Sequence, residues 1–152
     1  MALFEQFPYA NFHELNLDWT IKTVKELSDK WANTDPDELE AEPVLHAPAG
    51  MVVARRDYGV RDPAILQAIR RHTLGGPNMT AMDALIYVSD FIEPGRRPFP
   101  GLEDARALAE KDIFAAMALS ARLSSGYLTS RGKAPHPRTE ILIQQATGGE
   151  AE

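Results

Sequence analysis

The chain has 152 residues, enough for one domain with a buried core, and its 44% hydrophobic and 25% charged content is that of a globular protein. The absence of cysteine excludes disulfides and thiolate zinc sites. A net charge of -6 argues against nucleic acid as a ligand and would suit a basic protein partner. No apolar run could span a bilayer and the N-terminus lacks a secretory pattern, so we expect a cytoplasmic protein without a membrane anchor.

The first half of the chain has helical spacing of its apolar residues. In residues 17–31 they recur every three or four positions and form one stripe: Leu17, Ile21, Val24, Leu27 and Trp31. A second helix is predicted over residues 45–58, with Pro48 in its first turn and Gly59 at its end.

The middle of the chain contains two helices with clear start signals. Residues 61–72 form the first, with Asp62 as cap and Pro63 at the first helical position. Its predicted buried face consists of Ile65, Leu66 and Ile69. The stretch GGP ends it, and Thr80 with Asp83 starts the next helix as a variant of the capping box. That helix carries the apolar residues Ala84, Leu85, Tyr87 and Val88.

The last third is also helical. A loop rich in proline and glycine covers residues 93–101, and residues 102–133 are predicted to form one or two helices. Their apolar positions are Leu108, Ile113, Phe114, Met117, Leu119 and Leu123. A short helix follows over residues 136–145, and residues 146–152 are predicted to be a frayed tail. With no alternation typical of strands, the fold class is all-α, a bundle of about six or seven helices.

Three polar side chains lie beside predicted helix ends and could bind a metal. They are His46, His72 and Asp90, an imidazole and carboxylate donor set that suits a divalent ion. A single histidine of this kind more often caps a helix or contacts a loop, so the structural interpretation stays open for each. We give His13 a surface or capping role, and His136, between two prolines, a place in a rigid loop or at a helix entry; neither is a predicted ligand.

Two pairs of arginines accompany these residues. Arg96 and Arg97 follow Asp90, and Arg70 and Arg71 precede His72. Guanidinium groups near a metal can hold phosphate oxygens in bidentate fashion, and a solvated loop is the alternative. The sequence contains no glycine-rich phosphate loop, nucleophile elbow or HExxH motif.

Several ordered motifs resemble one family. The stretches are LHAPAG, AIRRHTLG, ALIYVSDFIEPGR, FPG followed by LAEKD, and HPRTE, and together they resemble the YqeK family of HD-domain phosphohydrolases from about residue 27 or 38 to residue 143. The resemblance implies an all-α HD-domain-like bundle that splits diadenosine tetraphosphate symmetrically into ADP. It also implies a pair of divalent metal ions, usually iron, with His46, His72 and Asp90 among their ligands.

The chain departs from this family pattern near its start. No His-Asp dipeptide occurs in it, although that pair and an earlier histidine supply metal ligands in the family. Residues 1–26 instead weakly resemble the N-termini of phage structural or accessory proteins. We therefore expect a non-family segment at 1–26, an HD-like domain truncated on its N-terminal side at 27–145, a disordered tail at 146–152, and an incomplete metal site with impaired hydrolysis.

Two functions of different classes follow. The first is a metal-dependent nucleotide phosphohydrolase that acts on a dinucleoside polyphosphate. The second is a non-catalytic phage-type binding protein, such as an inhibitor or antitoxin-like factor, that uses an HD scaffold to bind a protein partner. The change of character near Leu27 would also fit a natural or designed chimera of two sources.

Overall fold

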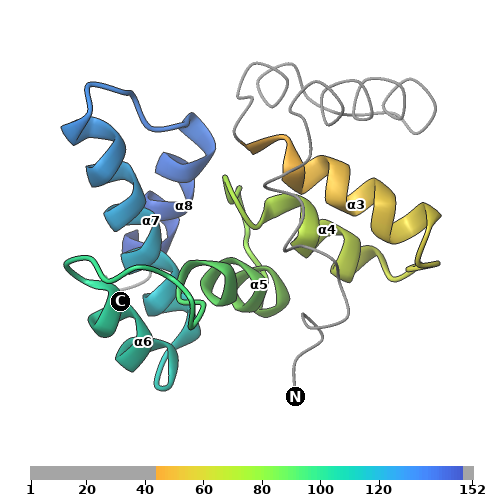
Figure 1. Cartoon of the computed structure of the whole chain (residues 1–152), viewed down its shortest axis with the longest axis horizontal. Coiled ribbons are helices and arrows are strands. Elements are labelled where there is room, and N and C mark those ends of the chain that lie inside the picture. Colours follow the sequence, from red (N-terminus) through yellow and green to blue (C-terminus); the bar gives the residue numbers. More distant parts are fainter. Residues whose placement is uncertain (1–43, 149–152) are drawn as a thin grey trace. The chain divides into compact units, whose positions relative to one another are not determined.

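A computed structural model describes residues 44–148, and the chain divides into two compact units, residues 1–60 and 61–152. The described part of the first unit contains the helix α3 (His46–Arg56), and the second unit contains the helices α4 to α8 (Figure 1). No strand occurs between residues 44 and 148, so the predicted all-α class is confirmed there. The predicted helix at 17–31 and His13 lie outside the described residues.

Helix α3 begins one residue after the predicted start and ends at Arg56, where the backbone N–H of Asp57 donates to the Val53 carbonyl at 2.8 Å. Pro48 lies in its first turn, where the backbone N–H has no intrahelical acceptor, so the ring costs no hydrogen bond. Gly59 follows with φ +69°, a backbone conformation that glycine adopts without steric cost. Small residues dominate the buried face of the helix: Ala47, Pro48, Ala49, Gly50 and Ala54.

Helix α4 (Pro63–Arg71) starts as its sequence predicts, because Asp62 Oδ1 accepts a hydrogen bond from the backbone N–H of Ala64 at 2.8 Å. The predicted buried face was partly wrong. Leu66 and Ala68 are buried, whereas Ile65 is 38% exposed. Ile65 is about 100° around the helix from Leu66, so it points away from the stripe that the neighbouring helices cover.

Helix α5 (Ala81–Phe91) begins with the predicted capping box: Thr80 Oγ1 accepts from the Asp83 N–H at 3.2 Å, and Asp83 Oδ2 accepts from the Thr80 N–H at 2.9 Å. Of its apolar residues, Tyr87 and Val88 are buried, whereas Leu85 is 49% exposed. The carboxylate Asp83 is fully buried.

The segment after the loop forms two helices, α6 (Leu102–Ala109) and α7 (Ile113–Ser130). Asp112 separates them because its Oδ1 caps the new helix, accepting from the backbone N–H groups of Phe114 and Ala115 at 3.0 Å each. Phe114, one of the apolar positions of this segment, is 44% exposed and lies outside the core. Helix α8 (Pro137–Gly148) continues into the first residues of the predicted tail.

In the second unit, α5 packs against α4 and α7, and α7 packs against α6 and α8 (Figure 1). A buried hydrophobic cluster lies where α5, α7 and α8 meet and consists of Ala84, Tyr87, Val88, Ala116, Met117, Ala121 and Leu142. Helix α5 is therefore held on two sides, which fixes the direction of the residues that it carries. Among the described helices, none is long and apolar enough to cross a membrane.

Candidate functional site

His72 ends helix α4 and is partly buried. Its Nδ1 atom lies 2.6 Å from the carbonyl oxygen of Ile69. A carbonyl can only accept, so Nδ1 carries the hydrogen and the lone pair of the neutral ring is on Nε2. Histidines that bind metals commonly have this arrangement, in which a hydrogen bond from one ring nitrogen orients the other. The donor chemistry of His72 thus fits a divalent ion.

The turn that follows, residues 72–80, is called the His72 turn below. Helix α8 holds it at three points. Thr139 Oγ1 donates to the Leu74 carbonyl at 2.9 Å, and Gln145 Oε1 accepts from the Asn78 N–H at 2.8 Å. Between them, Gly75 has φ +71° and lies so close to Leu142 that an added Cβ would be 2.3 Å from Leu142 Cδ1.

Asp83 fastens the other side of this turn. Besides the capping box, its Oδ2 accepts from Thr80 Oγ1 at 2.9 Å and from Gln67 Nε2 at 3.2 Å, and Arg71 Nη1 lies 3.5 Å away. Arg71 also donates to the Pro77 carbonyl at 3.3 Å. Arg71 therefore has structural partners. The sequence indicated the cap and did not indicate this buried polar cluster, because Gln67 and Arg71 reach Asp83 only after the two helices pack.

Asp90 lies on the last turn of α5 with a side chain that is 54% exposed. Arg96 Nη2 donates to its backbone carbonyl at 2.8 Å and lies 3.8 Å from its Oδ2. The Arg96 guanidinium also lies over the Phe91 ring, 5.6 Å from its centroid. Arg96 thus closes the loop after Asp90, while Arg97 is exposed to solvent.

The remaining histidines have different surroundings. His46 is the first residue of α3 and belongs to the first unit, whereas His72 and Asp90 belong to the second. His136 immediately precedes α8, the helix entry that the sequence indicated, and its Nδ1 accepts from the backbone N–H of Arg138 at 3.2 Å. Between residues 44 and 148, no three histidine, aspartate or glutamate side chains are grouped as a metal would need. The ligand assignment for His46, His72 and Asp90 stays a prediction.

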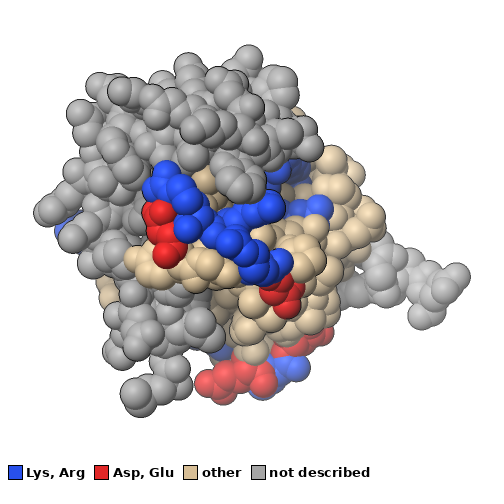
Figure 2. All heavy atoms as spheres, turned by 90° about the vertical axis from the view of Figure 1, so that its right-hand side faces the viewer, with Lys and Arg blue, Asp and Glu red and all other residues tan. Residues whose placement is uncertain are grey.

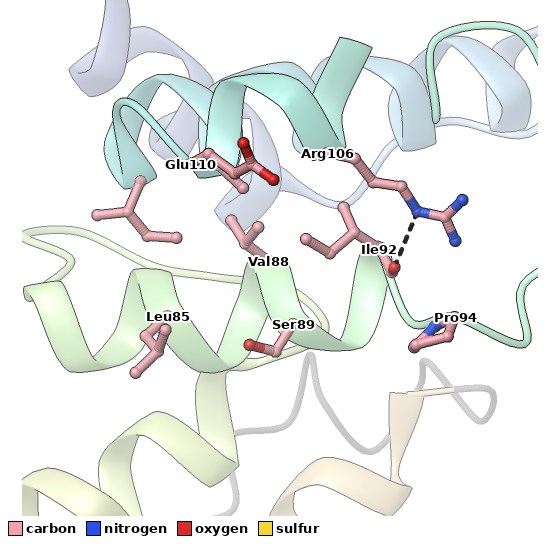
Figure 3. Close-up of a pocket in the computed structure, with 9 residues that line it drawn as sticks. Leu85, Val88, Ser89, Ile92, Pro94, Arg106 and Glu110 are labelled. Atoms are coloured by element: carbon pink, nitrogen blue, oxygen red, sulfur yellow. Dashed lines mark hydrogen bonds between the residues drawn. The ribbon is translucent and has the colours of Figure 1, made fainter. Parts of the chain in front are cut away.

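A groove of about 540 Å³ lies between α5, α6 and the start of α7 (Figure 3). Val88 and Ile92 form its apolar wall on α5, and Glu110 lies above them. Arg106 closes one end by donating from Nε to the Ile92 carbonyl at 3.2 Å, drawn as the dashed line, and from Nη2 to the Glu93 carbonyl at 2.9 Å. The sequence did not predict this groove. The apolar residue Leu85 lines the groove and is exposed, but the sequence alone does not show that it is exposed, because its burial depends on how the helices pack.

The charge is unevenly distributed along the chain. Residues 44–148 contain 13 Lys and Arg and 10 Asp and Glu, a net charge of +3, whereas residues 1–43 contain 3 Lys and 10 Asp and Glu. Figure 2 shows that both basic and acidic side chains of the described residues reach the surface on the face it draws. The net negative charge of the whole chain therefore does not extend to residues 44–148, which include His72 and Asp90. The net positive charge of these residues is compatible with an anionic ligand.

No protein-family model matches the chain. Two curated relatives are named symmetrical bis(5'-nucleosyl)-tetraphosphatase. The protein of Bacillus subtilis is 42% identical over 112 residues, 73% of this chain and 60% of its own length. That of Halalkalibacterium halodurans is 36% identical over 142 residues, 90% of this chain and 72% of its own length. The chain thus spans about 60 to 70% of these relatives.

Among solved structures, the fold resembles that of a predicted HD superfamily hydrolase from Clostridium acetobutylicum, described as involved in NAD metabolism. The TM-score is 0.78 at 27% identity, over 89% of this chain and 69% of that one. The helical architecture around α5 and α7 is therefore that of an HD-type hydrolase. Together with the Halalkalibacterium match, this places the chain in the family of symmetrical bis(5'-nucleosyl)-tetraphosphatases.

Proposed function

We propose that this protein is a metal-dependent phosphohydrolase that cleaves dinucleoside polyphosphates such as diadenosine tetraphosphate, releasing ADP. The names of the curated relatives support the substrate class. The single structural observation that carries the proposal is the 2.6 Å contact from His72 Nδ1 to the Ile69 carbonyl, since it orients the imidazole in the form that binds a divalent ion.

In this proposal His72 and Asp90 are metal ligands, and His46 is the third. A bound divalent ion, iron by family resemblance, would supply an activated water and neutralise phosphate charge. Arg97 is the exposed cation next to the Asp90 loop that could contact a phosphate. Arg96 would act indirectly, by holding the loop that carries Arg97, because its guanidinium donates a hydrogen bond to the Asp90 carbonyl.

We further propose that turnover is slow compared with that of the relatives. The chain contains no His-Asp dipeptide, and metal-site catalysis depends on the number and geometry of the ligands. Three ligands can still bind one ion, so the expected result is weak metal binding with a low rate of ADP release.

The test is incubation of the purified chain with diadenosine tetraphosphate and Mn²⁺ or Fe²⁺, with ADP measured by chromatography. The matched pair of variants is His72→Ala and His136→Ala, since His136 is not among the proposed ligands and its Nδ1 accepts from the backbone N–H of Arg138 at the start of α8. We expect ADP from the wild type and from His136→Ala, and a loss of at least tenfold in His72→Ala. Equal ADP release by the wild type and His72→Ala would contradict the catalytic proposal.

A non-catalytic binding protein is the second candidate. Two observations favour it: the chain has no His-Asp dipeptide, and the described residues gather no group of three metal-binding side chains. This candidate predicts less than one metal ion per chain in the purified protein, and no ADP release. One ion per chain, measured by plasma emission spectrometry, would count against it and support the first proposal, and two ions would show that the chain has ligands beyond His46, His72 and Asp90.

A further inference from the structure

The C-terminal helix α8 has a face directed at the His72 turn. Thr139, Leu142 and Gln145 are spaced by three residues and therefore share one side of the helix. Each lies at a different point of the turn: Thr139 at the Leu74 carbonyl, Leu142 at the position that a Cβ on Gly75 would occupy, and Gln145 at the Asn78 N–H. These three residues are called the α8 face below.

The strongest of these contacts is buried. Thr139 is 7% exposed and Leu74 is 8% exposed, and their hydrogen bond joins residues 65 positions apart in the sequence. A buried carbonyl that loses its donor costs more than an exposed one, because water cannot replace the lost bond. Leu74 is two residues after His72, and the Gly75 N–H donates to the Arg71 carbonyl at 2.8 Å, so the turn is rigidly joined to the end of α4.

Asp83 holds the same turn from α5 through Thr80 and Arg71. The backbone around His72 is thus fixed by helices on two sides. The Nδ1 hydrogen bond to Ile69 depends on that backbone, since the ring and its acceptor lie on the last turn of α4. A displacement of Leu74 would be transmitted to the imidazole directly.

We propose that Thr139 is a positioning residue for His72, and that the α8 face sets the orientation of the His72 imidazole for metal binding. The inference rests on the proposed function insofar as it makes His72 a ligand. The HPRTE motif, which contains Thr139, thereby gains a physical role: its hydroxyl keeps the Leu74 carbonyl, and with it the His72 turn, in place.

The experiment compares Thr139→Val, Thr139→Ser and Ser120→Ala in the full chain. Valine keeps the shape of threonine and removes the hydroxyl, and serine retains the donor. Ser120→Ala is the matched control, because it also removes one buried hydroxyl that donates to a backbone carbonyl. That carbonyl belongs to Ala116, at 2.8 Å, and both residues lie on α7, outside the α8 face.

Two readouts are needed. The first is the NMR signal of the His72 ring nitrogens in the metal-free protein, which reports the tautomer and its hydrogen bond. The second is the affinity for Mn²⁺ alone, followed by electron paramagnetic resonance. We expect Thr139→Val to change the His72 ring signals and to weaken Mn²⁺ binding severalfold, with an upper bound of about tenfold, the loss expected when a metal-binding histidine loses its own hydrogen-bond partner. Thr139→Ser and Ser120→Ala should remain near the wild type in both.

Wild-type ring signals and wild-type Mn²⁺ affinity in Thr139→Val would overturn the inference. So would equal changes in Thr139→Val and Ser120→Ala, because they would indicate general loosening of the bundle. If His72→Ala binds Mn²⁺ as well as the wild type, the ligand role in the proposed function fails. The positioning role is then decided by the His72 ring signals of the metal-free Thr139→Val variant alone.

Discussion

The two segments that carry the candidate ligands of the second unit are held in different ways. The His72 turn receives hydrogen bonds from Thr139 and Gln145, which are 65 and 67 residues away from their partners. The loop after Asp90, residues 92–101, is held by hydrogen bonds from Arg96 and Arg106. These arginines are 6 and 14 residues away from their partners, the carbonyls of Asp90 and Ile92. The segment of one candidate ligand thus depends on the C-terminal helix, and the segment of the other depends mainly on residues nearby in the sequence.

This difference has a physical consequence. Distant contacts form only when the whole bundle packs, so the geometry at His72 should be lost with global unfolding of the second unit. Local contacts can persist or open on their own, so the Asp90 loop can loosen without disturbing His72. The edge-to-face contact of Phe91 with Phe99, with centroids 5.5 Å apart, belongs to the same local set, although Gly101 at the end of the loop packs against Leu123 of α7.

The largest expected effect is that of Gly75→Ala. A Cβ there would lie 2.3 Å from Leu142 Cδ1 on a backbone with φ +71°. We expect a loss of about 2–4 kcal/mol in the free energy of unfolding, from the unfavourable backbone conformation together with overpacking. Gly132→Ala is the control, because Gly132 has the same φ of +71° and nothing within 4 Å of an added Cβ.

The control should lose only about 1 kcal/mol, the cost of the backbone conformation alone. Urea denaturation of both variants gives the two values. Equal losses of unfolding free energy in Gly75→Ala and Gly132→Ala would show that the Leu142 side chain moves aside without cost. In that case α8 does not confine the His72 turn.

Arg106→Met tests whether the loop at residues 92–101 is held by contacts close in the sequence. The substitution removes the donors to the Ile92 and Glu93 carbonyls and retains an apolar side chain of similar length. We expect a loss of about 1–2 kcal/mol, together with faster hydrogen exchange in residues 92–101 and unchanged exchange in residues 72–80. Arg122→Met, on an exposed position of α7, serves as the control. Faster exchange in both segments would mean that the two are coupled.

A smaller, pH-dependent effect is expected at Tyr87, on the helix between the two segments. Burial, together with the Asp90 carboxylate, raises the pKa of the Tyr87 phenol above its usual range. The folded protein then resists ionisation that the unfolded chain undergoes near pH 10, so stability is fully present below that pH and is lost as the pH rises further.

Tyr87→Phe has no phenol to ionise, so it should lack this pH-dependent loss of stability. Thermal denaturation of both proteins between pH 8 and pH 11 should therefore give parallel melting temperatures up to about pH 10 and a steeper decline for the wild type above it. An identical decline in both proteins would show that Tyr87 does not control the alkaline limit.

The relation between sequence and structure is clearest at the helix starts. Asp62 with Pro63, and Thr80 with Asp83, cap α4 and α5 as predicted, because capping depends on residues within one turn of each other. The buried faces were less predictable. Leu85 and Phe114 are apolar and exposed, since burial depends on which neighbouring helix covers a face.

The sequence by itself determined the helical class, the caps and the family of this protein, because local hydrogen bonding and ordered motifs are properties of short stretches of chain. Only the tertiary structure decided that Arg71 and Gln67 converge on the buried Asp83, that Arg96 closes the Asp90 loop, and that α8 holds the His72 turn. Each of these is a contact between side chains and backbone of separate elements. Such contacts exist only after the helices have packed, and no periodicity in the sequence encodes them.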